Sequence, residues 1–115
     1  MWNVVREKSL KFWIRISKFY VYLKKKNLFE ISSQIFRSWT SIGANIAEAQ
    51  YAISRREFVS KLQISLKEAF ETIYWFEVLE NWFWECCKSL KDDCIELTKL
   101  LISIIKSSKY NIHHS

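Results

Sequence analysis

Most of the residues whose types and spacing could do chemistry lie in the stretch SIGANIAEAQYAISRREF, residues 41–58. Asn45 and Glu48 are three residues apart, a spacing that places both side chains on one face of a helix. Together with Glu71 they could act as an acid or base pair, but catalysis would also need a nucleophile or metal and a cleft. The sequence shows no such third group, so we favour a structural hydrogen-bonding network. An unpaired buried polar group costs about 1–3 kcal/mol.

The same stretch contains a helix start. Ser54 followed three residues later by Glu57 is a capping box, in which each side chain satisfies a backbone N–H. Arg55 and Arg56 then fall in the first turn, where the helix dipole disfavours cations. A phosphate could compensate them, held by guanidinium groups and backbone N–H groups. A salt bridge to Glu48, to Glu57 or to a neighbouring subunit could do so equally well, and both interpretations remain open.

Metal binding and known catalytic chemistry are not expected. A structural zinc site needs four ligands at short spacings, and no histidine is near Cys86, Cys87 and Cys94 in the sequence. We therefore interpret these thiols as buried structural groups or as groups without a role. Their odd number fits a reducing compartment. His113 and His114, in the last residues, could form at best a weak, fortuitous chelator. Dinucleotide, Walker, zinc-protease and serine-hydrolase motifs are absent, so we expect no enzyme, no cofactor and no small-molecule substrate.

These residues must be positioned by helices. The chain has 115 residues with one glycine and no proline, which favours long helices joined by short connections in one domain, 1–115. Hydrophobic periodicity predicts helices at about 4–25, 30–50, 55–82 and 90–107, with a frayed tail at 108–115. We predict an all-α, up-down-up-down antiparallel four-helix bundle. The apolar runs are too short to span a membrane and the N-terminus is charged, so we expect a cytoplasmic protein.

Each predicted helix has an inner face. On the first helix it is marked by Val5, Phe12, Ile16, Phe19 and Leu23. On the others it is marked by Ile31, Ile35, Trp39, Ile42 and Ile46; by Phe58, Leu62, Ser65, Ala69, either Thr72 or Ile73, and Phe76; and by Cys94, Leu97, Leu101 and Ile104. Gly43 costs about 1 kcal/mol relative to alanine in a helix, and it could permit close approach of a neighbouring helix. On the first helix Leu10, Trp13, Ile14 and Val21 lie outside the inner face. This surplus of apolar side chains predicts self-association.

Charge is distributed unevenly along the chain. Residues 1–29 hold eight lysines and arginines against one glutamate, a net charge of +7, whereas residues 57–85 hold two lysines against six glutamates, a net charge of −4. A cationic region of this kind predicts an anionic partner or a head-to-tail contact between copies. The candidate nucleic-acid-binding residues are Lys8, Lys11, Arg15, Lys18, Lys24, Lys25 and Lys26, with Arg55 and Arg56.

Three segments carry a family resemblance: SSQI at 32–35, SIGANIAE at 41–48 and SRREF at 54–58. They resemble the four-helix-bundle proteins encoded in intervening sequences of 23S ribosomal RNA genes, a superfamily that includes the accessory variability determinant proteins of diversity-generating retroelements. The resemblance implies a homopentamer with a basic, nucleic-acid-binding surface and no known catalysis. It also marks Gln34, Asn45, Glu48, Ser54, Glu57 and Glu71 as a structural polar motif. Relatives usually have proline where this chain has Gly43, glycine at Ala49 and Gly-Ser at Lys67-Glu68.

Two functions follow as hypotheses. The first is a non-enzymatic homo-oligomer that binds RNA or DNA through sequence-independent phosphate contacts, whose affinity falls as salt rises. The alternative is a protein–protein scaffold whose basic face docks an acidic surface, with no nucleic-acid ligand. Replacing basic residues of the first helix with acidic ones distinguishes the two hypotheses, because only the first requires nucleic-acid affinity to fall. A membrane role is not expected, since the aromatic residues do not favour one basic amphipathic face.

Overall fold

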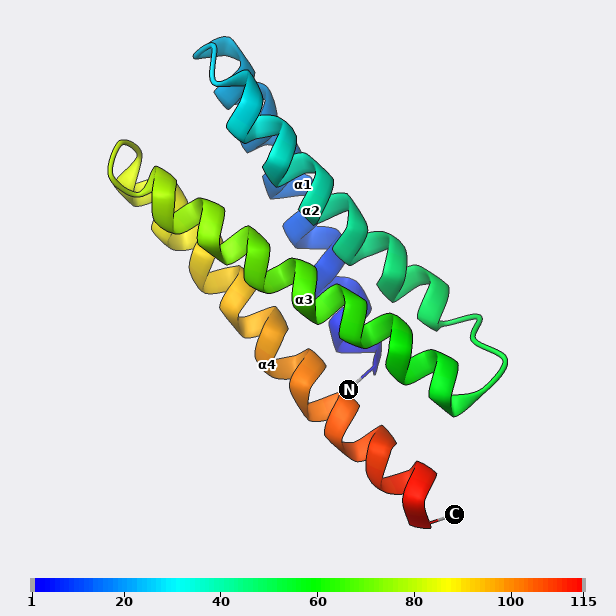
Figure 1. Ribbon diagram of the computed structural model, residues 1–115. Coiled ribbons are helices and arrows are strands. Elements are labelled where there is room, and N and C mark those ends of the chain that lie inside the picture. The colour runs from blue at the N-terminus through cyan, green and yellow to red at the C-terminus, as the bar shows by residue number, and fades with distance from the viewer. Residues whose placement is uncertain (1, 115) are drawn as a thin grey trace.

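The computed structural model describes the backbone of residues 2–114 and side chains as far as residue 111. It consists of four helices joined by short connections (Figure 1). They are α1 (Trp2–Lys25), α2 (Phe29–Ala49), α3 (Arg55–Leu79) and α4 (Trp84–His114). Within the described residues, no helix combines the length and the apolar character needed to cross a membrane.

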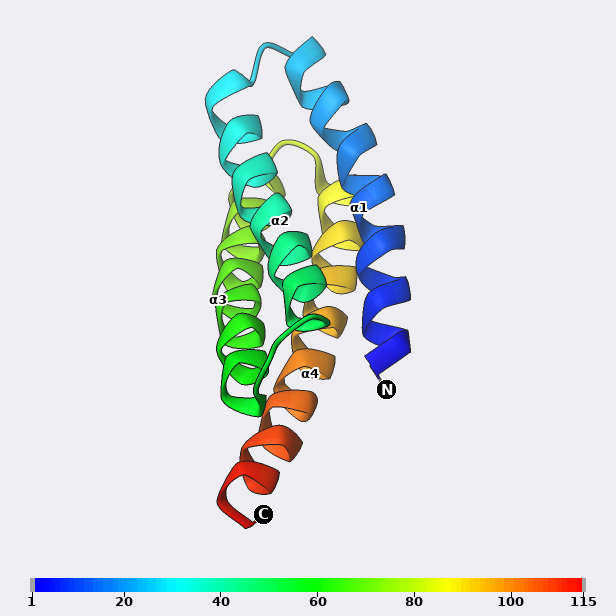
Figure 2. The ribbon, with the colours of Figure 1, turned by 90° about the vertical axis from the view of Figure 1, so that its right-hand side faces the viewer.

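The helices form a closed ring of neighbours. Each packs against the next along the chain, and α1 also packs against α4, whereas the backbones of the diagonal pairs of described helices stay apart. The bundle measures 51 × 20 × 20 Å. Figure 2 shows the α1–α2 and α3–α4 connections at one end and the α2–α3 connection toward the other. The predicted all-α antiparallel four-helix bundle is confirmed.

The core follows the predicted inner faces. All five residues predicted for α1 are buried, and Trp39 of α2 lies fully buried with the ring of Phe12 packed edge-on at 4.1 Å between centroids. Of the other predicted positions, Ile31 and Phe58 are half-buried at the margin of the core. The face of α4 extends beyond the prediction at both ends, to Cys87 and Ser108.

Buried hydroxyls link α2 to α3. Ser38 and Thr72 are hydrogen-bonded at 2.8 Å, and Ser65 donates to the carbonyl of Ile42 at 2.9 Å. Because a hydroxyl is small and can donate to a nearby carbonyl, these residues allow close packing without leaving a polar group unpaired. These small buried residues of α3 thus pack directly against α2.

The boundaries of the last two helices differ from the prediction. Helix α3 ends at Leu79, not near residue 82, and the N–H groups of Trp82 and Phe83 both bond to the Leu79 carbonyl in the following turn. Helix α4 begins at Trp84, not near residue 90, and continues to His114. The predicted frayed tail is therefore wrong over 108–114. Residues 84–115 contain neither glycine nor proline, so no signal ends this helix early.

The α1–α2 connection is a tight turn. Asn27 adopts φ 63°, the left-handed region that asparagine tolerates better than most residues. The N–H of Leu28 then reaches back to the Leu23 carbonyl at 3.0 Å, which satisfies an otherwise open group at the end of α1. This turn fixes Lys24, Lys25 and Lys26 at one end of the bundle.

Candidate functional site

Two cations of the predicted basic set on α1 are held by α4. Lys8 pairs with Glu96, and Arg15 pairs with Asp93 while also donating to Ser89 Oγ at 2.8 Å. Asp93 and Glu96 belong to the turns of α4 that lie beside α1. These two cations therefore already have partners within the chain, and we remove them from the set that is free to meet an external anion.

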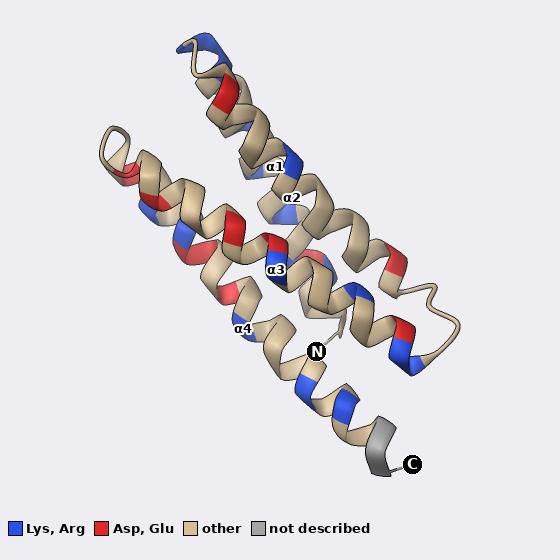
Figure 3. Ribbon diagram, in the orientation of Figure 1, with Lys and Arg blue, Asp and Glu red and all other residues tan. Residues whose placement is uncertain are grey.

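Five lysines of the same set remain exposed. They are Lys11, Lys18, Lys24, Lys25 and Lys26. None of them forms an ion pair with any residue in the described part of the chain. Lys11, Lys18 and Lys25 recur every seven residues, or two helical turns, and so follow one line along α1. Lys24–Lys26 form the basic tip visible at the α1–α2 connection (Figure 3).

Arg55 and Arg56 lie elsewhere. Both are exposed in the first turn of α3, toward the end of the bundle opposite to Lys24–Lys26. The intramolecular salt bridges weighed for them do not form: Glu48 pairs with Lys61 at 3.3 Å, and Glu57 accepts from the Ile53 N–H at 2.8 Å. The nine predicted nucleic-acid-binding residues thus divide into paired cations, a line with a basic tip, and a separate arginine pair.

The capping box at the start of α3 forms with one change of partner. Ser54 Oγ accepts from the Glu57 N–H at 3.0 Å, as predicted. The Glu57 carboxylate reaches the N–H of Ile53, one residue before the expected Ser54. Residues 50–54 therefore form a corner between two helices.

The predicted polar residues do not converge on one site. The side-chain amide of Asn45 donates to the Ser41 carbonyl on its own helix at 2.8 Å. Glu48 pairs with Lys61, as stated above, and Glu71 instead bonds to Arg37. The acid–base pair considered for Asn45, Glu48 and Glu71 does not assemble, and the structural interpretation accounts for each contact.

Gln34 and Glu71 join a polar network centred on Arg37, which also includes Glu68. The sequence analysis did not identify Arg37 or Glu68 as members of it. Arg37 bonds to Glu71, to Glu68 at 3.3 Å and to the Gln34 side-chain oxygen at 3.5 Å. The hydrogen bond from Arg37 lowers the pKa of Glu71, whereas burial and then the hydrogen bond with Glu71 raise the pKa of Glu68. The spacing of three between Gln34 and Arg37, and between Glu68 and Glu71, was the available signal.

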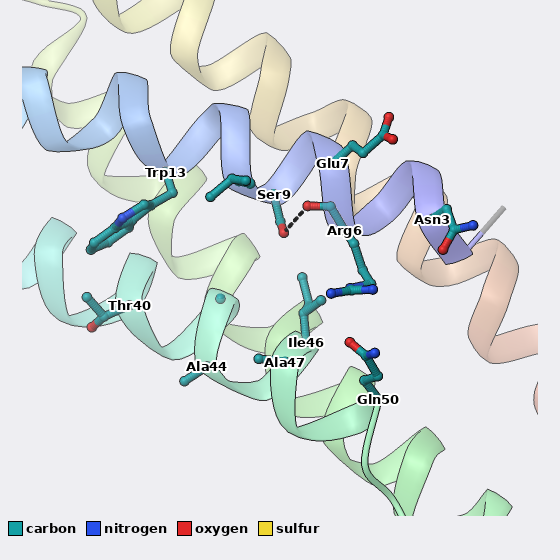
Figure 4. Close-up of a pocket in the computed structure, with 12 residues that line it drawn as sticks. Asn3, Arg6, Glu7, Ser9, Trp13, Thr40, Ala44, Ile46, Ala47 and Gln50 are labelled. Atoms are coloured by element: carbon teal, nitrogen blue, oxygen red, sulfur yellow. Dashed lines mark hydrogen bonds between the residues drawn. The ribbon is translucent and has the colours of Figure 1, made fainter.

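A groove separates the first half of α1 from the second half of α2. It has a volume of about 670 Å³, and Figure 4 shows Trp13, Arg6 and Gln50 around it, with Ala44 and Ala47 on the α2 side. Gly43 also lines it, and a Cβ added there would meet no atom within 4 Å. The close helix approach considered for Gly43 is therefore wrong within this chain, because the glycine borders open space.

Exposed apolar residues lie on α1, at this groove and beyond it. Leu10, which lines it, is 61% exposed, and Ile14 and Val21 further along α1 are each 50% exposed. Trp13 was predicted to be one of the apolar residues left outside the core. It is instead half-buried, with its ring stacked on Trp39 at 6.1 Å between centroids. Three of the four surplus residues therefore remain on the surface.

The comparisons with known proteins bear on this whole arrangement. The family model for the 23S rRNA-intervening sequence protein matches residues 2–103, which include α1, α2, α3 and most of α4. The chain belongs to this family. It is also similar to a crystal structure of a protein with unknown function from the S23 ribosomal protein family of Bacteroides thetaiotaomicron VPI-5482. That similarity has 50% identity and a TM-score of 0.86, and it covers 91% of this chain and 97% of that chain. No curated protein matches the sequence.

In this member of the 23S rRNA-intervening sequence family, the cysteines form no metal-binding cluster with other described residues. Cys86 is exposed, whereas Cys87 and Cys94 are buried, and burial raises the pKa of each buried thiol to about 12. No group of three or more histidine, cysteine, aspartate or glutamate residues could hold a metal in the described part of the chain. The side chains of His113 and His114 lie outside the described residues.

Proposed function

We propose that this protein is a non-enzymatic bundle that assembles with copies of itself and binds RNA or DNA through phosphate contacts. The observation that carries the proposal is the set of five exposed lysines on α1 and in the turn after it that form no ion pair among the described residues. Lysines that neutralise phosphates release counterions, which gives affinity for nucleic acid without base specificity.

Self-association is supported by the surface beside those lysines. Leu10, Ile14 and Val21 present apolar side chains to solvent, and the groove between α1 and α2 is floored by Gly43, Ala44 and Ala47. An apolar side chain from a second copy fits such a floor, because burying it removes apolar surface from water. Family resemblance implies five copies. Assembly would repeat the lysine line in each subunit and raise the affinity for a long polyanion.

A salt titration of nucleic-acid binding tests the proposal. We expect a labelled RNA or DNA to bind at low salt, and the logarithm of its affinity to fall linearly with the logarithm of salt concentration. Absence of binding at low salt, or affinity that does not respond to salt, would contradict the phosphate mechanism.

Charge reversal then locates the surface. Changing Lys11, Lys18 and Lys25 to glutamate should abolish binding while the bundle stays folded, because all three are exposed and unpaired. The matched control changes three exposed lysines outside α1 to glutamate and alters the net charge equally: Lys67, Lys99 and Lys106. If the α1 variant instead changes the native mass and leaves nucleic-acid affinity untouched, the protein–protein scaffold is the correct function.

A further inference from the structure

Two connections meet at one end of the bundle. The α1–α2 turn and the α3–α4 turn lie at the same end, and the α1–α2 turn projects further (Figure 2). The rings of Tyr22 in α1 and Phe83 in the α3–α4 turn join them, edge to face, with centroids 5.7 Å apart. Residues distant in the sequence therefore lie together at this end of the bundle. We call the surface formed by Tyr22, Phe29, Trp82 and Trp84 the aromatic end.

Large aromatic side chains are exposed at the aromatic end. Trp82 is 68% exposed, Trp84 57%, Phe29 54% and Tyr22 40%. Exposed apolar residues are ordinary when scattered singly, but four aromatic rings gathered on two adjoining turns form a patch that indicates a binding surface. None of the four is needed to fill the core, because each leaves a large share of its side chain in solvent.

Lysines lie against aromatic rings at and beside this end of the bundle. Lys24 Nζ lies 5.2 Å from the centroid of the Tyr20 ring, Lys26 Nζ lies 5.6 Å from that of Tyr22, and Lys88 Nζ lies 6.0 Å from that of Trp84. Such contacts between a cation and an aromatic face hold both groups in place.

Acidic residues pair with only part of this charge. Lys88 lies 3.9 Å from Asp92, and Glu80 is paired with Lys91. The exposed carboxylates beside the two turns are Glu30, Glu77 and Glu85. None of Lys24, Lys25 and Lys26 forms an ion pair in the described chain. The aromatic end therefore offers stacking surfaces together with positive charge.

We propose that the aromatic end binds unpaired nucleotides, with bases stacked on the exposed rings and phosphates beside the lysines. The proposal rests on the proposed function and narrows its ligand to single strands or single-stranded loops. Base faces can stack on protein rings only where they are not already stacked in a duplex, and every base has such a face. The lysine line of α1 contacts phosphates alone, so it cannot make this distinction.

The test compares three probes of equal length, about 12 nucleotides, a size suited to a short single-stranded site. They are a labelled oligothymidylate, the same backbone without bases, and a duplex. By fluorescence anisotropy at one salt concentration we expect the oligothymidylate to bind at least tenfold more tightly than the abasic backbone, since both carry the same phosphates. Its binding should also quench tryptophan fluorescence.

Variants assign the effect to residues. Phe29→Leu combined with Trp84→Leu should weaken oligothymidylate binding about tenfold and leave abasic binding unchanged, an effect in the range of lost base stacking. Tyr51→Leu is the control, since Tyr51 is 79% exposed near the opposite end, beside the α2–α3 corner.

Each outcome decides between the two proposals. Equal affinity of the unmodified protein for the oligothymidylate and the abasic backbone would overturn the aromatic end while leaving phosphate binding intact. Failure of all three probes to bind at low salt would overturn both proposals. A change of native mass in the double variant, with oligothymidylate affinity unaltered, would overturn the nucleotide site and assign these rings to contacts between copies.

Discussion

Ser38 and Thr72 face each other across the contact between α2 and α3, with their hydroxyl oxygens 2.8 Å apart and both residues fully buried. A carbonyl oxygen of its own helix also lies within hydrogen-bond distance of each hydroxyl, that of Ile35 for Ser38 and that of Glu68 for Thr72, so the two hydroxyl protons are shared among three contacts. The pair is therefore a satisfied polar contact inside an apolar core, and its contribution to stability can be isolated.

We expect Ser38→Ala and Thr72→Val each to lower the free energy of unfolding by about 1 kcal/mol, because each leaves the other hydroxyl with fewer partners. The double variant should cost less than the sum of the two, since it removes both polar groups together. Urea unfolding of the four proteins measures this coupling. Strict additivity would mean that the two hydroxyls do not interact.

The Arg37 network predicts opposite roles for two neighbouring carboxylates. The folded-state pKa of Glu71 is lowered by Arg37, so Glu71 stabilises the fold above its unfolded pKa and loses that contribution as pH falls through the lowered value. The pKa of Glu68 is raised by burial, so its ionised form opposes folding at neutral pH.

Glu71→Gln should therefore destabilise the protein by about 1 kcal/mol at pH 7, a modest loss because the carboxylate is partly exposed. The difference from the parent should shrink below about pH 4, near the unfolded pKa of a glutamate. Glu68→Gln should change the free energy of unfolding by less than about 0.5 kcal/mol at pH 7, because the amide keeps an oxygen for Arg37 and removes a poorly solvated charge. Equal losses of unfolding free energy in Glu71→Gln and Glu68→Gln would refute these opposite roles.

The periodicity of the sequence was sufficient to predict the buried face of each helix. Phe12 and Ile16 of α1 and Leu97 and Leu101 of α4 repeat at helical spacing, and burial follows that spacing. The end of α4 was not predictable in the same way, since no glycine or proline marks it and its inner face continues to Ser108.

The site was predicted less completely, because it depends on how the helices are rotated against one another. The seven cations on α1 are visible in the sequence, but which of them meet carboxylates depends on Asp93 and Glu96 facing α1. The Arg37–Glu71 contact similarly requires the register of α2 against α3. The groove at Gly43 results from the separation of two helices, which no local pattern encodes.

The three thiols should differ in reactivity by exposure. Cys86 is exposed, so a disulfide reagent should modify one thiol quickly in the folded protein. Cys87 and Cys94 are buried with pKa values of about 12, so they hold almost no thiolate at neutral pH and should react only after unfolding. Counting released thiolate with and without denaturant measures both classes. Cys86→Ser should abolish the fast reaction, and persistence of that reaction would show that a buried thiol opens in the native state.

Gly43 gives the most direct test of what fills the groove. Because a Cβ there meets no atom within 4 Å, Gly43→Ala should raise the free energy of unfolding by up to about 1 kcal/mol through helix propensity alone. Gly43→Leu should leave the single chain folded but place an isobutyl group in the space proposed for a second copy. We expect this variant to lose native mass in sedimentation experiments while its helical circular dichroism is retained. Gln63→Leu, at an exposed position on α3, adds an apolar side chain outside the groove and should keep the parent's mass. If Gly43→Leu assembles as the parent does, copies meet through another surface, and the exposed side chains of Leu10 and Ile14 require a different partner.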